Sequence, residues 1–247
     1  MIIFYIGIFF LGAALASFIN ATLYRIDKEY KYPKILTQSS HCENCKHQLS
    51  WMDLIPIFGF ILNRGKCKYC NSEVNLYYPI SEFILGTSFL ALSLYSLPSY
   101  FYLIILFLFI LSYYDIKEFG IPKNLTHVFL LTCLIIFVFT FDLTKLYFPI
   151  IICIVLLLLN LFKKSFGFGD ILIILGLGIL LTREQFIIFF WLSILIALLY
   201  SFFVMIKDRI NIKKAKIPMV PFLGISFVIS ILYGDILWIF VLKFLGL

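Results

Sequence analysis

The sequence predicts an all-α polytopic membrane protein with about eight transmembrane helices and one sizeable polar loop between the first two. Of its 247 residues, 63% are hydrophobic and only 13% are charged, whereas soluble domains are about 45–50% apolar and about 25% charged. Long apolar runs with few charges recur along the chain, and the largest polar segment between them carries four of the six cysteines. These observations place the chain in a bilayer.

Eight apolar runs are the expected spans, because about 20 apolar residues in a helix cross about 30 Å of hydrocarbon. They lie near residues 1–23, 79–97, 100–114, 125–141, 146–162, 171–181, 186–206 and 222–245. The first run could be mistaken for a signal peptide, but no Lys or Arg precedes Arg25, and signal peptides begin with a basic stretch. We therefore expect a retained first helix over residues 1–23, a polar domain over 24–78 and a membrane domain over 79–247.

The basic residues orient these spans. If the N-terminus lies outside, the segments on the cytoplasmic side are 24–78, 115–124, 163–170 and 207–221. They hold every Lys and Arg except Lys145, Arg183 and Lys243, which is the asymmetry of the positive-inside rule. The net charge of +7 therefore sets the topology and attracts anionic membrane lipids. We expect no nucleic-acid partner.

Two C-x-x-C pairs lie in the polar segment, and they are formed by Cys42, Cys45, Cys67 and Cys70. Four thiolates in two such pairs are typical of a tetrahedral Zn²⁺ site. The intervening residues 46–66 slightly exceed the usual spacing, which a longer hairpin accommodates. Disulfides are the alternative, but a cytoplasmic loop lies in a reducing compartment. We expect a structural zinc ion, with His41 and His47 as alternative ligands.

An apolar and aromatic stretch, residues 51–63, runs between the two cysteine pairs and is too short to cross a bilayer. It lies either at the membrane surface or in the core of the cysteine module, and the sequence favours neither. Its single acid, Asp53, is expected to cap a helix or form a salt bridge.

Two carboxylates border apolar runs that are too short to span a membrane. Asp115 follows one of them and Asp170 precedes the other. A charged side chain at the centre of a membrane helix costs about 2.5–3.5 kcal/mol on insertion scales, and such residues usually face a wet, functional cavity. If the helices extend to about Glu118 and from about Ser165, each acid lies one turn inside the cytoplasmic boundary. Because successive spans run in opposite directions, the two acids meet at one depth.

Such a pair predicts proteolytic chemistry. Two aspartates about 3 Å apart share one proton, so one member can take a proton from water while the other protonates the leaving amine. Gly167 and Gly169 remove side-chain bulk beside Asp170, so that a substrate backbone could approach. Taken singly, each aspartate would be a helix cap or an interfacial salt bridge. Glu82 enters the second span from the same side and is a candidate to shape the site.

Further motifs accompany this pair along nearly the whole chain. They are residues 12–20 followed by Arg25, Trp51-x-Asp53, Arg64-Gly65-x-Cys67, Tyr78-Pro79-x-x-Glu82, Asp115 with Ile121-Pro122, Gly167-x-Gly169-Asp170, and Ile217-Pro218-x-x-Pro221. Together with the cysteine pairs, this order resembles the type IV prepilin peptidases, polytopic aspartic proteases of the G-x-G-D class. The resemblance identifies Asp115 and Asp170 as the catalytic aspartates.

The resemblance implies a protein of the bacterial inner membrane whose active site and zinc loop face the cytoplasm. Its substrates would be prepilins and pilin-like secretion or competence proteins, cut after a Gly that follows a short basic leader. Many members of the family also N-methylate the new N-terminus with S-adenosylmethionine. No glycine-rich loop after a strand is visible here, so the sequence assigns no residues to that activity, nor does it give an oligomeric state.

The sequence departs from the family pattern in three places. Ala16 replaces a glycine and Ala21 a frequent valine, and both changes are expected to affect helix packing only. Leu172 stands where the family usually has a lysine, which is expected to alter recognition of the leader charge rather than cleavage.

Two other classes of protein could use these residues. A proton-coupled transporter would show repeats with interrupted helices near the bilayer midplane, and none is visible. A non-catalytic membrane scaffold would display the zinc loop to a cytoplasmic assembly, and its aspartates would be dispensable.

Overall fold

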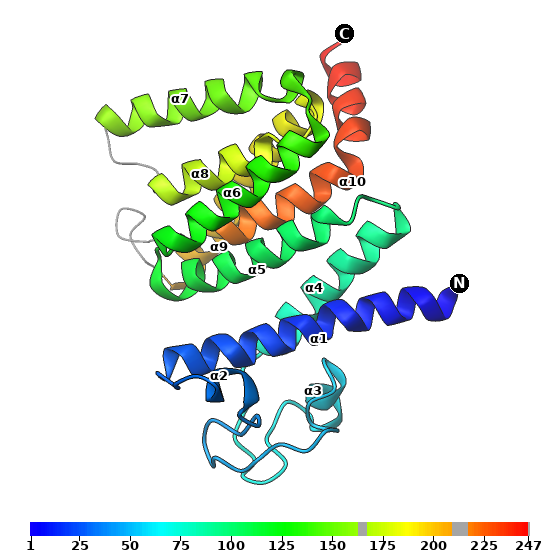
Figure 1. Ribbon diagram of the computed structural model, residues 1–247, viewed down its shortest axis with the longest axis vertical. Helices are drawn as coiled ribbons and strands as arrows, with labels where there is room; N and C mark the ends of the chain where they lie inside the picture. Colours follow the sequence, from blue (N-terminus) through cyan, green and yellow to red (C-terminus); the bar gives the residue numbers. More distant parts are fainter. Residues whose placement is uncertain (163–166, 209–216, 247) are drawn as a thin grey trace. The chain divides into compact units, whose positions relative to one another are not determined.

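The computed structural model describes residues 1–162, 167–208 and 217–246, and within these ranges every regular element is a helix (Figure 1). This confirms the all-α prediction. Residues 163–166 and 209–216, which carry basic residues of two expected cytoplasmic segments, lie outside the described ranges. The chain divides into two compact units, Met1–Pro98 and Ser99–Leu247, and each is described by itself.

The first unit is built on two long helices that pack against each other. Its helices are α1 (Ile2–Asp27), α2 (Lys34–Thr37), α3 (Phe58–Leu62) and α4 (Tyr77–Leu94). A Cβ atom added to Gly12 on α1 would lie 2.9 Å from the carbonyl oxygen of Leu85 on α4. One added to Gly86 would lie 2.9 Å from the carbonyl oxygen of Phe9. Small residues at this crossing therefore let the two backbones approach closely, as at other helix contacts in membranes.

Buried polar side chains connect the two long helices and the polar segment. The Nδ2 group of Asn20 on α1 donates a hydrogen bond of 2.8 Å to Oγ of Ser81 on α4. Near the end of α1, the buried guanidinium of Arg25 donates to the carbonyl oxygen of Ile35 at 3.0 Å. Since a buried polar group that lacks a partner is costly, these bonds hold the polar segment against α1.

The second unit is a bundle of long helices around a short one. Its elements are α5 (Tyr100–Glu118), α6 (Lys123–Thr140), the 3-10 turn η1 (Leu143–Lys145), α7 (Tyr147–Phe162), α8 (Phe168–Gly178), α9 (Arg183–Asp208) and α10 (Val220–Leu245). The short helix α8 lies between α6 and α7 and also contacts α10, while α10 packs on α5 and α9 (Figure 1). Two glycines allow α8 to pack closely against α6 and α7. A Cβ atom at Gly176 would lie 3.0 Å from the Phe129 ring, and one at Gly178 would lie 2.7 Å from Pro149.

Six of the eight expected spans are long and apolar enough to cross a membrane within the described residues. They are Ile2–Asp27, Tyr100–Glu118, Lys123–Thr140, Leu143–Phe162, Arg183–Ile206 and Val220–Phe244. The other two runs form α4 and α8. The first turns of α4 carry polar residues, including Ser81 and Glu82, and the described part of α8 is 11 residues long. These findings support a multi-pass membrane protein.

Of the two helices predicted to extend past their aspartates, α5 ends where predicted and α8 begins later than predicted. Helix α5 continues past Asp115 and ends at Glu118 as predicted, where Phe119 turns into the left-handed region at φ 50°. Helix α8 begins only at Phe168, because Gly167 has an extended backbone with ψ 137°. The expected start near Ser165 lies outside the described residues. Asp170 therefore occupies the first turn of its helix rather than the second.

Candidate functional site

The first predicted catalytic residue, Asp115, lies near the end of α5 and is 6% exposed. The backbone N–H of Val220 donates a hydrogen bond of 2.8 Å to its Oδ2 atom, and the N–H of Met219 also hydrogen-bonds to this carboxylate. Met219 and Val220 form the N-terminus of α10, where helical N–H groups have no partner within the helix. The start of one helix thus holds the carboxylate at the end of another.

The second predicted catalytic residue, Asp170, is half-buried in the first turn of α8. The backbone N–H of Gly167 hydrogen-bonds to its carboxylate. A Cβ atom at Gly167 would lie 2.7 Å from the Oδ2 atom of Asp170, closer than any ordinary contact. Gly167 therefore makes room for the carboxylate of Asp170 itself. A Cβ atom at Gly169 would lie 3.3 Å from Cδ1 of Ile121. The absence of a side chain at Gly169 therefore lets the loop before α6 pack closely against α8.

The structure brings these two residues together within the second unit. The carboxylates of Asp115 and Asp170 interact electrostatically, although 54 positions of sequence and two helices separate them. Two like charges that interact favour a state in which the pair holds one proton. General acid–base catalysis by two aspartates uses a proton shared in this way.

Glu82, the third carboxylate singled out in the sequence, belongs to the first unit. It is 8% exposed, and its Oε2 atom accepts the backbone N–H of Ile57 at 2.7 Å. The hydroxyl of Ser17 also hydrogen-bonds to it. In the described part of the chain, Glu82 thus links α1, the polar segment and α4. Its role toward the aspartate pair stays a prediction.

The four cysteines of the polar segment form one cluster, in which all the sulfur atoms lie within 4.8 Å of one another. The Sγ atoms of Cys42 and Cys70 are 3.8 Å apart, which equals the spacing of about 3.8 Å that zinc–sulfur bonds of about 2.3 Å produce in a tetrahedron. All four are free thiols, so the disulfide alternative is not supported. The cluster can hold a metal ion.

Two similar turns carry these cysteines. The N–H of Cys42 donates to the carbonyl of His47, and the N–H of Cys67 donates to the carbonyl of Ser72, at 3.0 and 2.8 Å. The hydroxyl of Ser72 hydrogen-bonds to Cys70 and lowers the pKa of its thiol to about 6, and the thiolate is the form that binds metal.

The two histidines considered as alternative ligands make other contacts. The ring of His47 packs on Tyr69 at 3.6 Å between centroids. Nδ1 of His41 lies 3.4 Å from the carbonyl oxygen of Ser39. Neither histidine belongs to the cysteine cluster.

Asp53 closes a turn instead of capping a helix as expected, because the N-cap of α3 is Ile57 and has no side-chain cap bond. Its Oδ2 atom accepts hydrogen bonds from the backbone and hydroxyl of Ser50, and its Oδ1 atom accepts one from Asn63 at 3.0 Å. The hydroxyl of Ser50 is the main cause that lowers the pKa of Asp53 below the usual carboxyl range. Asp53 therefore closes the turn that precedes α3, and the apolar side chains of Trp51 and Leu62 in this stretch are exposed.

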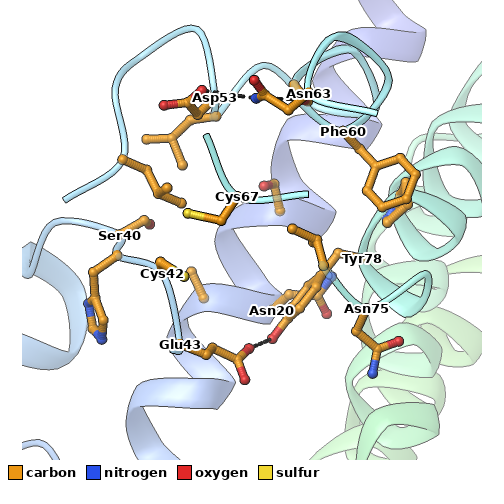
Figure 2. Close-up of a pocket in the computed structure, with 18 of the residues that line it drawn as sticks. Asn20, Ser40, Cys42, Glu43, Asp53, Phe60, Asn63, Cys67, Asn75 and Tyr78 are labelled. Atoms are coloured by element: carbon orange, nitrogen blue, oxygen red, sulfur yellow. Dashed lines mark hydrogen bonds between the residues drawn. The ribbon is translucent and has the colours of Figure 1, made fainter. Parts of the chain in front are cut away.

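Sequence reasoning missed two features of these sites. One is the pair of N–H groups at Met219 and Val220 that holds Asp115. The motif Ile217-Pro218-x-x-Pro221 was its only signal in the sequence, because proline is common at the start of a helix, where the N–H groups have no partner within the helix. The other is a cavity of about 320 Å³ in the first unit, between the cysteine turns and the helices α1 and α4 (Figure 2).

Two family profiles match the chain, and their boundaries agree with the two compact units, Met1–Pro98 and Ser99–Leu247. The profile of the Bacterial Peptidase A24 N-terminal domain matches residues 10–96, which include the cysteine cluster. The profile of the Type IV leader peptidase family matches residues 102–202, which include Asp115 and Asp170. No solved structure matches the chain.

The chain is similar to several proteins named prepilin leader peptidase/N-methyltransferase, of which three show the range of identity. The protein from Vibrio cholerae serotype O1 is 30% identical over 233 residues, which cover 87% of this chain and 91% of the relative. The Bacillus subtilis protein is 26% identical over 247 residues, covering 96% and 97%. The Aeromonas salmonicida protein is 23% identical over 219 residues, covering 81% and 73%. The chain belongs to the type IV leader peptidase family.

Proposed function

We propose that this chain is a membrane aspartic endopeptidase that removes the leader peptide from type IV prepilins and pilin-like secretion or competence proteins. The observation that carries the proposal is the interacting pair of Asp115 and Asp170, which lies within the residues matched by the leader peptidase profile. The names of the relatives supply the substrate class. A transporter or a non-catalytic scaffold is not favoured.

The mechanism follows from the pair of carboxylates. The ionised carboxylate takes a proton from water, and the water oxygen attacks the scissile carbonyl. The protonated carboxylate donates a hydrogen bond to that carbonyl and later gives its proton to the leaving amine. The N–H of Val220 keeps the carboxylate of Asp115 in one orientation during this exchange. The proton belongs to the pair rather than to one residue.

The distribution of basic residues supports a site at the cytoplasmic face of the bacterial inner membrane. Asp115 lies in the last turns of α5, followed by Lys117 and, at the start of α6, Lys123. Lys163 and Lys164 precede Asp170 in the sequence. Positive charges beside both aspartates support a cytoplasmic position for this end of the helices. A prepilin whose apolar helix lies in the membrane would present its leader at the same depth.

A structural zinc ion fits the cluster of Cys42, Cys45, Cys67 and Cys70. Four thiolates complete a tetrahedral shell and leave no position open for a substrate. The ion would join the two cysteine turns of the first unit, which have a single turn of helix, α3, between them. The cysteines would therefore act on the stability of the first unit rather than on peptide hydrolysis.

A direct test uses the purified full-length protein with a prepilin and measures the intact mass of the product. Asp115→Asn and Asp170→Asn each remove one member of the pair while preserving its shape, so cleavage should fall to background. Asp142→Asn is the matched control, because Asp142 only caps η1 through Thr144, and it should cleave at the wild-type rate. Wild-type cleavage by either dyad variant would refute the assignment.

A second activity, N-methylation of the new N-terminus, is proposed because the relatives are named N-methyltransferases as well as peptidases. S-adenosylmethionine would be the methyl donor. In the same assay, its addition should increase the mass of the cleaved product by one methyl group.

A further inference from the structure

We propose that the apolar segment between the two cysteine turns, residues 54–62, is a re-entrant segment that lies in the hydrocarbon layer beside α1 and contacts lipid acyl chains. Its sequence is Leu-Ile-Pro-Ile-Phe-Gly-Phe-Ile-Leu, without a polar or charged side chain, and its second half forms α3. Both of its ends lead to a cysteine turn, so the chain would enter and leave the membrane on the side of the cysteine cluster. The segment belongs to the first unit and takes no part in peptide hydrolysis.

The depth of this segment follows from its contact with α1. The ring centroids of Phe58 and Phe10 lie 5.9 Å apart, and α3 lies beside α1 (Figure 1). Helix α1 has 26 residues and is a candidate membrane span, whereas about 20 helical residues cross the hydrocarbon layer. Every stretch of about 20 residues within α1 contains Phe10. The side chain of Phe58 therefore lies at the depth of the hydrocarbon, whichever part of α1 spans it.

The exposed side chains of the segment continue a membrane-facing surface. Leu54, Phe58, Ile61 and Leu62 are all exposed. Beside Phe58 runs a groove of about 380 Å³, which is lined by residues of α1 and α4 and is apolar or aromatic throughout. Large exposed apolar patches mark protein or membrane contacts. Since this patch is continuous with side chains of a membrane span, lipid acyl chains are the partner that it fits.

The backbone of the segment is suited to an environment without water. Irregular backbone at membrane depth is tolerated only where the protein covers it and satisfies its polar groups. Gly59 is buried, and a Cβ atom there would lie 2.2 Å from the carbonyl oxygen of Asp53. Several N–H groups donate to carbonyl oxygens of residues 51–57, and they are those of Leu54, Ile55, Phe58, Gly59 and Ile61.

Glu82 satisfies a further N–H group of this backbone from outside the segment. Ile57 has φ 65°, a left-handed conformation that is rare for a β-branched residue. Its N–H donates to Oε2 of Glu82 on α4 at 2.7 Å. A carboxylate thus holds the start of α3 against a neighbouring helix. This bond gives Glu82 a positioning role in the first unit.

The residues that flank the segment suit the level of the lipid headgroups. Arg64 and Lys66 follow it and are exposed, and basic side chains at a membrane surface attract anionic lipids. Asp53 precedes it and accepts a hydrogen bond from Asn63 at 3.0 Å. The polar residues at the two ends are therefore bonded to each other, while the basic ones face outward.

Fluorescence quenching of the full-length protein in lipid vesicles tests this placement. The tryptophans of the chain are first replaced by phenylalanine, at Trp51, Trp191 and Trp238. Phe58→Trp and Ile61→Trp then put a sole tryptophan in the segment. Tyr69→Trp is the matched control, because Tyr69 is an exposed aromatic residue between Cys67 and Cys70. Brominated acyl chains should lower the emission of both segment probes at least about twofold and that of the control less than about 1.2-fold.

A second pair of variants tests the bond that holds the segment. In the Phe58→Trp protein, Glu82→Ala removes the acceptor of the Ile57 N–H, whereas Glu82→Gln keeps an acceptor oxygen in its place. Lipid quenching should fall at least about twofold in Glu82→Ala and stay within about 1.2-fold in Glu82→Gln. Equal quenching in both would overturn the role of Glu82. Melting curves show whether each variant is folded.

The remaining results decide what the segment contacts. If acrylamide in the water phase quenches folded Phe58→Trp and brominated lipid does not, the segment lies in the polar domain and the proposal is overturned. Loss of lipid quenching at Ile61→Trp when a prepilin is added would also overturn it, because the surface would then receive the apolar helix of the substrate. Asp115→Asn should be quenched like its parent, so failure of the proposed peptidase would leave this placement unaffected.

Discussion

Replacing Gly167 by alanine tests whether the position of one carboxylate controls catalysis. A Cβ atom at this position would lie 2.7 Å from Oδ2 of Asp170, and ordinary van der Waals contact begins at 3.4 Å. The backbone of Gly167 has φ −64° and ψ 137°, which alanine adopts without strain. The added methyl group must therefore push the carboxylate away by several tenths of an ångström. Catalytic geometry that is wrong by about 1 Å can cost about 100-fold in rate.

We expect Gly167→Ala to cleave a prepilin about 10- to 100-fold more slowly, with little change in melting temperature. Two matched substitutions should produce a graded series. The Cβ atom of Gly169→Ala would lie 3.3 Å from the flexible end of Ile121, so this variant should cleave slightly more slowly than wild type. The Cβ atom of Gly120→Ala would have no neighbour closer than 3.9 Å, so this variant should cleave at the wild-type rate. The measurement is the initial cleavage rate from intact-mass time courses, with melting curves for each variant. A Gly167→Ala enzyme as fast as Gly120→Ala would refute the steric reasoning.

Three further predictions concern other parts of the chain. Val220→Pro removes the N–H that holds Asp115 and should lower the cleavage rate by more than tenfold, whereas Val220→Ala keeps this N–H and should cleave normally. Cys67→Ser should abolish stoichiometric zinc in elemental analysis and lower the melting temperature of the full chain, since the four thiolates bind the ion as a unit. The hydrogen bonds that lower the pKa of Asp53 add stability above the usual carboxyl pKa of about 3.9. That stability is lost as the pH falls below this value, so Asp53→Asn should lower the melting temperature at pH 6 and change it less near pH 3. An equal effect at both pH values would contradict the sign of this shift.

The membrane architecture could be predicted because it depends on local sequence. An apolar run crosses hydrocarbon wherever it occurs, so the helices lie close to the predicted runs, and α5 ends at Glu118 as its length required. The four cysteines were also recognisable, because a C-x-x-C turn brings two thiols together locally. The start of α8 was not predicted correctly, since Gly167 leaves the helix through its own backbone conformation.

The candidate active site could be predicted only in part. Matching depth in the membrane indicated that Asp115 and Asp170 meet, but depth carries no information about what surrounds them. The N–H of Val220 reaches Asp115 across 105 positions of sequence. Likewise, the free oxygen of Asn20 faces a cavity formed by α1, α4 and the cysteine turns together.

The sequence by itself therefore determined the class of protein, its helices and the cysteine cluster, and it singled out the two aspartates as the candidate catalytic pair. Apolar length, charge asymmetry and short motifs are properties of neighbouring residues, which a single chain displays directly. Only the tertiary structure decided how Asp115 is held and where an unpaired acceptor and a buried carboxylate share a cavity. Those features depend on contacts between segments distant in sequence, and these contacts exist only after the helices have packed.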